Sequence, residues 1–195
     1  MAPGGRDGSE GDDAGADAEV VTLLRAQRDL RAFEPLYRRY YRPVFDYCYR
    51  RLGDHERAAD ASSQVFTKAL AGIHGFRSGS VAAWLFTIAR NTVIDAVRTH
   101  RPHLTLSDAP VIADSAAAPD VAVIAGDRQR LLYQALGRLT ADQRAIVELR
   151  WVGLTGPEIA GTLGLSLAAV KSGQYRAYAR LRTLLAREDL LGDVS

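Results

Sequence analysis

Apolar residues recur every three or four positions through most of this chain, which is the spacing of one face of an α-helix. The pattern runs from Ala18 to about His100, and again from about Asp127 to Ala186. No segment shows the alternation of apolar and polar residues that a half-buried strand requires. We therefore predict an all-α protein made of two small helical domains.

Turn-forming residues divide the first helical block. Pro35 fits the first turn of a helix, whereas Pro43 is expected to kink or break the helix because proline has no N–H to donate. Gly53 and Asp54 end this element. The elements expected after them are helices over about residues 56–71 and 81–99, with a loop over 74–80.

The second block contains a short helix, a glycine turn and a longer helix. A helix over 141–151 comes first, and Thr155 with Glu158 three residues later then forms a capping-box start. Gly164 supplies the turn before a helix over about 167–185. This order is typical of a helix-turn-helix, whose second helix enters the DNA major groove. An ordinary helical hairpin with a solvated basic face remains the alternative.

The longer helix carries side chains that suit DNA. Lysine and arginine neutralise phosphates or donate to guanine, glutamine pairs with adenine, and tyrosine packs on sugar or on a thymine methyl group. The candidate DNA-contacting residues on this helix are Lys171, Ser172, Gln174, Tyr175, Arg176 and Arg180.

The net charge of +2 conceals an uneven distribution of charge. Residues 20–101 carry +7 and residues 127–187 carry +6, whereas the linker over 102–126 carries −3. The Gly/Ala/Asp-rich segment 1–19, at −5, is predicted to be disordered, and a short acidic tail covers 188–195. Two basic blocks indicate that a polyanion is bound at two places, although helix faces with solvated arginines would give the same distribution of charge.

Composition limits the class of protein further. The chain has 195 residues, 47% of them hydrophobic, and its one cysteine cannot form an internal disulfide. Cys48 falls on an apolar helix face and is most simply a core residue. We find no membrane span, signal peptide, metal-ligand spacing, phosphate-binding loop or catalytic constellation. The expectation is a cytoplasmic protein that is not an enzyme and has no metal or cofactor.

Two strings in the sequence resemble one protein family. Residues 84–91 read WLFTIARN and are followed by Asp95 and Arg98, and residues 136–181 contain the helix-turn-helix. In this order, and joined by a linker, they resemble the extracytoplasmic-function sigma factors of bacterial RNA polymerase over about residues 30–185. The resemblance implies a sigma-2-like domain (20–101) and a sigma-4-like domain (127–187). It also implies binding to core polymerase, recognition of the −10 and −35 promoter elements, and promoter melting.

The resemblance also implies roles for individual residues. The helix-turn-helix residues given above would read the −35 element. The −10 element would be bound by the loop over 74–80 and the helix after it, through Arg77, Ser78, Ser80, Trp84, Arg90, Asn91 and Arg98, with Arg101 on phosphate. A core position is the alternative for Trp84, and a local hydrogen-bonding role is the alternative for Asn91. The polymerase clamp would be contacted by Asp60, Ser63, Gln64 and Phe66.

The sequence departs from the family pattern at three places, which involve five residues. Ser63 and Gln64 stand where glutamine and an acidic residue are usual, which affects the clamp contact. Ala168-Ala169 replaces Gly-Thr. Gly173 replaces a common basic residue, so that a phosphate contact is lost and the helix weakened by up to ~1 kcal/mol.

Two other functions are consistent with parts of the sequence. A conventional helix-turn-helix activator would bind duplex DNA without polymerase, but the WLFTIARN string argues against it. A protein-interaction module that never acts on DNA is disfavoured by the basic recognition helix. The resemblance implies an anti-sigma factor as a further partner, and an acidic linker that either mimics nucleic acid in the polymerase cleft or serves as a spacer.

Overall fold

The computed structural model describes residues 10–100 and 127–192, all of whose regular structure is helical. The first bundle contains α1 (Glu10–Ala26), η1 (Leu30–Phe33), α2 (Glu34–Leu52), α3 (His55–Gly72), η2 (Ile73–Gly75) and α4 (Val81–His100), where η denotes a 3₁₀-helical turn. The second contains α5 (Asp127–Gly137), α6 (Ala141–Trp151), α7 (Gly156–Leu163) and α8 (Leu167–Gly192). The all-α prediction is confirmed, and the predicted linker lies outside the described residues.

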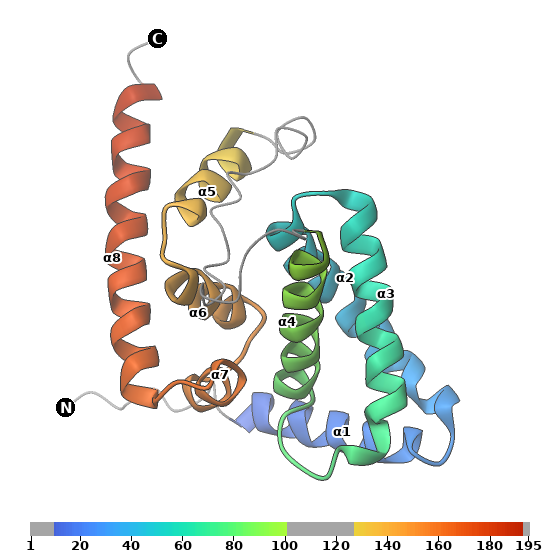
Figure 1. Ribbon diagram of the computed structural model, residues 1–195. Coiled ribbons are helices and arrows are strands. Elements are labelled where there is room, and N and C mark those ends of the chain that lie inside the picture. The colour runs from blue at the N-terminus through green and yellow to red at the C-terminus, as the bar shows by residue number, and fades with distance from the viewer. Residues whose placement is uncertain (1–9, 101–126, 193–195) are drawn as a thin grey trace, which may run out of the picture.

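The first bundle forms around α2, α3 and α4, with α1 crossing their lower ends (Figure 1). Pro35 lies in the first turn of α2, as predicted. Gly53 ends α2 in the left-handed region at φ 70°, which glycine adopts at little cost. The Asp54 side chain accepts from the backbone N–H of Arg57 at 2.8 Å and so starts α3.

One prediction about the first bundle is wrong, and one of the two outcomes expected at Pro43 does not occur. Residues 10–19 are helical, since α1 begins at Glu10; residues 1–9 lie outside the described part. The Glu19 carboxylate anchors the end of this segment, because it accepts from the Tyr40 hydroxyl at 2.6 Å and pairs with Arg39 at 2.7 Å. Of the kink or break expected at Pro43, the break does not occur, because α2 runs on to Leu52. Buried Tyr40, Val44 and Tyr47 on the same helix offset the lost hydrogen bond.

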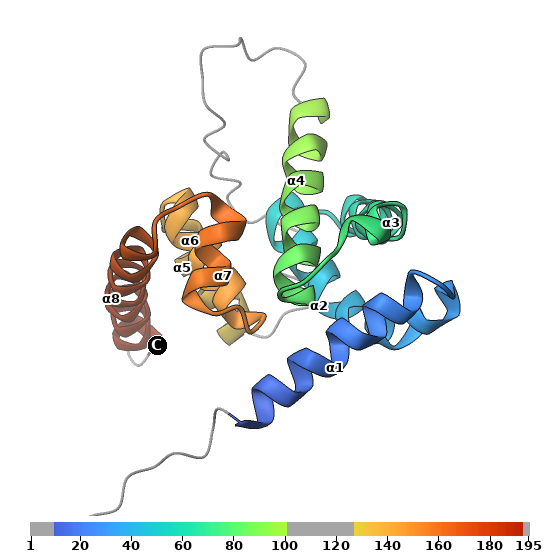
Figure 2. The same cartoon turned by 90° about the horizontal axis from the view of Figure 1, so that it is seen from below.

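The second bundle places α6 and α7 between α8 and α4, in both views (Figures 1 and 2). One small core joins α5, α6 and α8 through Leu136, Val147 and Ala177. The other apolar side chains of α6 and α7, such as Leu149 and Ile159, belong to the core cluster of the first bundle. The two bundles therefore share one continuous core in this structure.

Candidate nucleic-acid interface

The helix-turn-helix has the predicted caps. The backbone N–H and the hydroxyl of Thr155 donate to Glu158 Oε2 at 2.6 and 2.7 Å, which starts α7. Gly164 ends α7 at φ 68°, and the Ser166 hydroxyl then accepts from the backbone N–H of Ala169 at 3.1 Å at the start of α8. These bonds set the direction in which α8 leaves the turn.

The outer face of α8 is free of other helices, because α8 lies on the side of the molecule away from α4 (Figure 1). Tyr175 is 77% exposed, the largest exposed fraction among the large apolar side chains described. Gln174 differs, since it is half-buried and its side-chain oxygen accepts from Arg150 Nη2 at 3.3 Å. The predicted residues that are exposed are Lys171, Ser172, Tyr175, Arg176 and Arg180.

Sequence reasoning missed three residues at this surface. Tyr178 and Arg182 continue the exposed stripe of Lys171 and Tyr175 at helical spacing, which was the signal that could have found them. Arg138 precedes α6 and lines a hollow of about 480 Å³ together with Arg180. The basic surface is therefore longer than the recognition half of α8.

A basic side chain at position 173 could not contact a phosphate in this structure. It is buried, and a Cβ atom built there would lie 2.6 Å from Ile146 Cδ1 of α6. A basic residue at this position would point into the contact between α6 and α8. Glycine lets the two helices approach closely, so the interpretation of Gly173 from the sequence is wrong.

The loop before α4 is held by the first bundle. The Gln27 side-chain amide donates to the carbonyls of Ile73 and Phe76 at 2.8 and 2.9 Å. The Phe76 ring packs edge-on against Trp84, with centroids 5.6 Å apart. The Ser80 hydroxyl accepts from the backbone N–H of Ala83 at 3.1 Å and so caps α4. A fixed backbone thus presents the exposed side chains of this loop.

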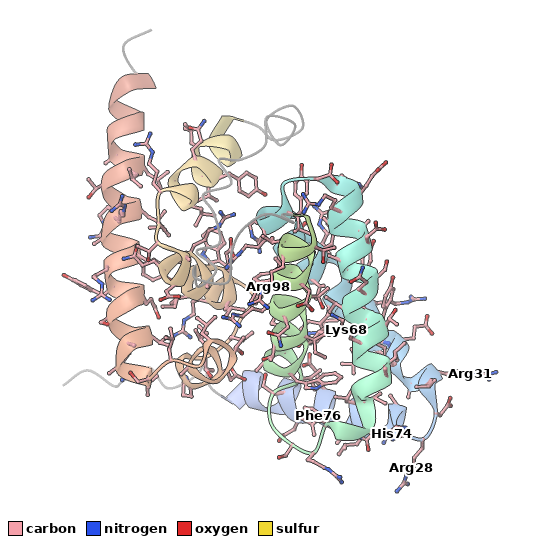
Figure 3. All side chains as sticks on the ribbon, in the orientation of Figure 1. Arg28, Arg31, Lys68, His74, Phe76 and Arg98 are labelled. Carbon is pink, nitrogen blue, oxygen red and sulfur yellow. The ribbon has the colours of Figure 1, made fainter. Side chains whose placement is uncertain are left out.

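The predicted −10 residues do not share one environment. Arg77, Ser78, Asn91 and Arg98 are exposed, whereas Ser80, Trp84 and Arg90 are half-buried. In Figure 3, Phe76 lies at the loop below α4 and Arg98 farther up the helix. Lys68 of α3 pairs with Asp95 at 3.4 Å, which adds a cation to this part of the surface. Arg101 lies outside the described residues.

The predicted clamp-contacting residues lie on α3, but not all at its surface. Asp60, Ser63 and Gln64 are exposed. Phe66 is buried, with its ring 4.8 Å from that of Tyr37. Phe66 therefore supports the exposed tyrosine ring and does not itself face a partner in this structure.

A buried charge cluster joins the two bundles, and no pattern in the sequence predicts it. Glu148 of α6 is fully buried and accepts from Arg51 of α2 at 2.7 Å and from Arg144 at 2.9 Å. Arg50 lies 3.9 Å from the same carboxylate, and Arg144 also donates to the Arg50 carbonyl. Burial alone would raise the pKa of Glu148, but Arg51, Arg144 and Arg50 outweigh it and hold that pKa below its usual range. We call these four residues the Glu148 cluster.

Other kinds of site are not seen in the part of the chain that is described. Residues 10–100 and 127–192 contain no group of three or more metal-ligating side chains that could hold an ion. None of the helices described is long and apolar enough to cross a membrane. The described residues present one exposed face of basic and tyrosine side chains on α8 and a second polar surface on α4 of the other bundle.

Comparison with known proteins gives the family. Residues 36–103 match Sigma-70 region 2, and residues 129–181 match Sigma-70, region 4. The chain is 33% identical to the ECF RNA polymerase sigma factor BldN of Streptomyces coelicolor, with 87% of this chain and 68% of that protein covered. It is 30% identical to the ECF RNA polymerase sigma factor SigX of Bacillus subtilis, with 83% and 88% covered.

A solved structure gives the same family. The sigma factor RpoE of Bartonella quintana, in complex with the anti-sigma factor NepR, is similar with a TM-score of 0.62 and 25% identity, covering 79% of this chain and 96% of that one. The chain belongs to the extracytoplasmic-function sigma factors, the sigma-70 family subunits that direct RNA polymerase to promoters. The resemblance seen in the sequence is confirmed.

Proposed function

We propose that α8 reads the −35 element and that α4, with the loop before it, binds the −10 element. The exposed stripe of α8 is the observation that carries the first assignment: Lys171, Tyr175 and Tyr178 project from a capped helix whose outer face is free. Lysine and arginine on this face suit phosphates and guanine edges, and tyrosine suits sugars and thymine methyl groups.

The assignment of the −10 element is supported by the loop over 76–80 and by α4. Arg77 and Ser78 are exposed on a backbone that Gln27 holds in place, with the aromatic edge of Trp84 beside them. Holding an unpaired base needs polar and aromatic groups next to a positively charged surface. Asn91 and Arg98 extend this surface along α4.

The proposed partners are core RNA polymerase, promoter DNA and an anti-sigma factor, and the proposed compartment is the cytoplasm. The exposed side chains of Asp60, Ser63 and Gln64 on α3 suit the polymerase contact. An anti-sigma factor is proposed because the structurally similar RpoE is bound to NepR. The protein itself supplies DNA and polymerase contacts, and we assign it no reaction of its own.

In vitro transcription tests this function. Bacterial core polymerase is combined with a pool of promoter fragments, with and without this protein, and the transcripts are sequenced. We expect initiation that depends on the protein, with shared −35 and −10 sequences upstream of the start sites. Duplex binding by the protein alone, without initiation or core binding, would favour a conventional activator.

An arginine variant tests the phosphate contact proposed for α4. Arg98→Ala is expected to weaken promoter binding by the holoenzyme on all sequences alike and to lower the salt slope by about one. Arg31→Ala is the matched control, since Arg31 is also exposed but lies at the far corner of the bundle (Figure 3). An unchanged salt slope for Arg98→Ala would contradict the contact.

A further inference from the structure

The contact between the two bundles covers part of the proposed −10 surface. The Thr87 hydroxyl of α4 lies 3.4 Å from the Thr162 hydroxyl of α7. Ser80, at the start of α4, and Glu158 of α7 line the same hollow between the bundles. The helix that precedes the recognition helix therefore packs directly against the residues proposed to bind unpaired bases.

The hollow between the bundles shows the same overlap. It has a volume of about 420 Å³ and is lined on one side by loop and α4 residues and on the other by α7. Arg77, Ser78 and Trp84 line the first side, and Glu158 and Thr162 line the second. The acidic side chain of Glu158 thus stands in the space beside Arg77 and Trp84 into which a DNA strand would have to enter.

This arrangement does not fit a promoter. The −10 and −35 elements are about 25 base pairs apart, or roughly 85 Å of B-DNA at 3.4 Å per base pair. With α7 in hydrogen-bond range of α4, one molecule cannot place α4 and α8 on the two elements together. The bundles must separate before both elements are bound.

The Glu148 cluster ties the bundles together in the closed arrangement. The carboxylate belongs to α6, whereas Arg50 and Arg51 belong to α2, so that these charges are paired across the interface only when the bundles touch. A charge that is buried without its partner is strongly unfavourable. The cluster therefore penalises other ways of packing the two bundles and specifies this one.

The cluster is also suited to reversible opening. Arg51 Nη2 and Arg50 Nε are buried and have no hydrogen-bond partner among the described residues. Pairing that is incomplete recovers less of the cost of removing these charges from water. When the bundles separate, all four side chains can return to water, so the closed arrangement is specific without being irreversible.

The surfaces that remain exposed indicate how opening would begin. Asp60, Ser63 and Gln64 of α3 stay accessible in the closed arrangement, as does the Tyr175 face of α8. Core polymerase can therefore reach its proposed contact on α3 while α7 still covers α4.

We propose that this sigma factor has a closed, autoinhibited form, in which α7 masks the −10 surface of α4 and the Glu148 cluster holds the bundles together until core polymerase separates them. The masking of the −10 surface rests on the proposed function, whereas the closure itself does not. Separate measurements therefore test the two parts.

Closure is tested by an engineered disulfide. Thr87→Cys and Thr162→Cys are combined in a Cys48→Ala background, because the two hydroxyls already lie 3.4 Å apart. We expect rapid disulfide formation in the free protein under mild oxidation, and at least fivefold slower formation after core polymerase is added. Formation that is slow, or unaffected by core polymerase, would overturn the proposal.

The role of the Glu148 cluster is tested in the same crosslinking assay. Glu148→Gln is expected to slow disulfide formation at least threefold, because the neutral amide cannot form ion pairs with the arginines. Asp142→Asn is the matched control, since Asp142 is an exposed acidic residue on the same helix. Circular dichroism at the assay temperature checks that both variants are folded. Equal crosslinking rates in folded Glu148→Gln and the control would rule out this role.

Transcription then tests autoinhibition. The oxidised, locked protein is expected to bind core polymerase but to lose at least tenfold in initiation on a fragment recovered from the promoter pool, and reduction is expected to restore it. Each single-cysteine variant serves as the oxidation control. Equal initiation by locked and reduced protein would overturn autoinhibition. If the reduced protein is also inactive, the proposed function and the masking both fail, while the crosslinking result still decides closure.

Discussion

Cys48 illustrates how burial sets the chemistry of a single side chain. The thiol is fully buried on α2, and burial raises its pKa to about 11, with the neighbouring Ser62 side chain opposing the shift. Because the thiolate is the reactive form, a buried thiol with a raised pKa is a poor nucleophile. The structure agrees with the interpretation of Cys48 as a core residue and makes direct redox sensing by this residue unfavourable.

Alkylation checks this conclusion. In the folded protein at pH 8, Cys48 is expected to react with iodoacetamide at least a hundredfold more slowly than in denaturant, as followed by mass spectrometry. A Ser63→Cys variant provides the comparison, since residue 63 is exposed on α3 and should be labelled quickly. Labelling of Cys48 at the rate of residue 63 would contradict the burial.

At the candidate site, the helix on which each residue lies was predicted correctly more often than the exposure of its side chain. Gln174 and Phe66 fall on the expected helices, but Arg150 holds the first inward and the ring of Tyr37 covers the second. Both contacts come from residues that are distant in the sequence. Helical spacing shows which direction a residue faces, but it does not show what another element places there.

At the scale of elements, the crossing of α6 and α8 depends on the absence of a side chain at residue 173. Gly173→Ala is expected to destabilise the protein by about 1–2 kcal/mol, because the steric cost at the Ile146 methyl exceeds the gain in helix propensity. In an Ile146→Val background, which removes that methyl group, the same substitution is expected to be neutral or stabilising. Urea denaturation midpoints measure both effects, and equal destabilisation in the two backgrounds would exclude this contact as the cause.

Elements with local signals were predicted closely. The sequence predicts helices over 81–99 and 141–151, and the structure has them over Val81–His100 and Ala141–Trp151. The Thr155–Glu158 cap also forms as predicted. These features depend on residues within one helical turn of each other.

Elements that depend on distant contacts were predicted incorrectly. The middle of α1 is anchored by the bonds of Glu19 with residues some twenty positions later, which composition cannot reveal. The continuity of α2 through Pro43 likewise rests on side chains that are buried against other helices. In both cases tertiary contacts outweigh a local preference.

At the scale of the whole molecule, the sequence predicts two domains but not the contact between them. Glu148 looks like one more charged residue on an amphipathic helix, 97 positions away from its partner Arg51. The pattern of apolar residues cannot show that Leu149 and Ile159 complete the core of another bundle. The closed arrangement therefore became visible only in three dimensions.

The stability of the contact between the two bundles should depend on pH, and Glu148 sets the direction of that dependence. The groups that act on its carboxylate are Arg50, Arg51 and Arg144, with the Tyr47 hydroxyl also close to the cluster. Together the arginines lower the pKa of Glu148 in the closed form despite its burial. In the open form the carboxylate is in water, where its pKa is about 4.3. Opening therefore takes up a proton only at acid pH.

The pKa of Glu148 is lower in the closed form than in the open form. Its ionised carboxylate therefore stabilises the closed form fully above about pH 4.3, and this stabilisation is lost as the pH falls through the pKa of the closed form. Glu158 acts in the same direction: burial alone would raise its pKa, but hydrogen bonds from Ser80 and Thr155 outweigh this and lower it.

Energy transfer between dyes on the two bundles is expected to stay constant from pH 8 to about pH 5 and to fall below about pH 4.5. In Glu148→Gln the part of this fall that is due to Glu148 should disappear, while far-ultraviolet circular dichroism follows any general acid unfolding. A fall of the same size in both proteins would mean that protonation of Glu148 does not control the contact between the bundles.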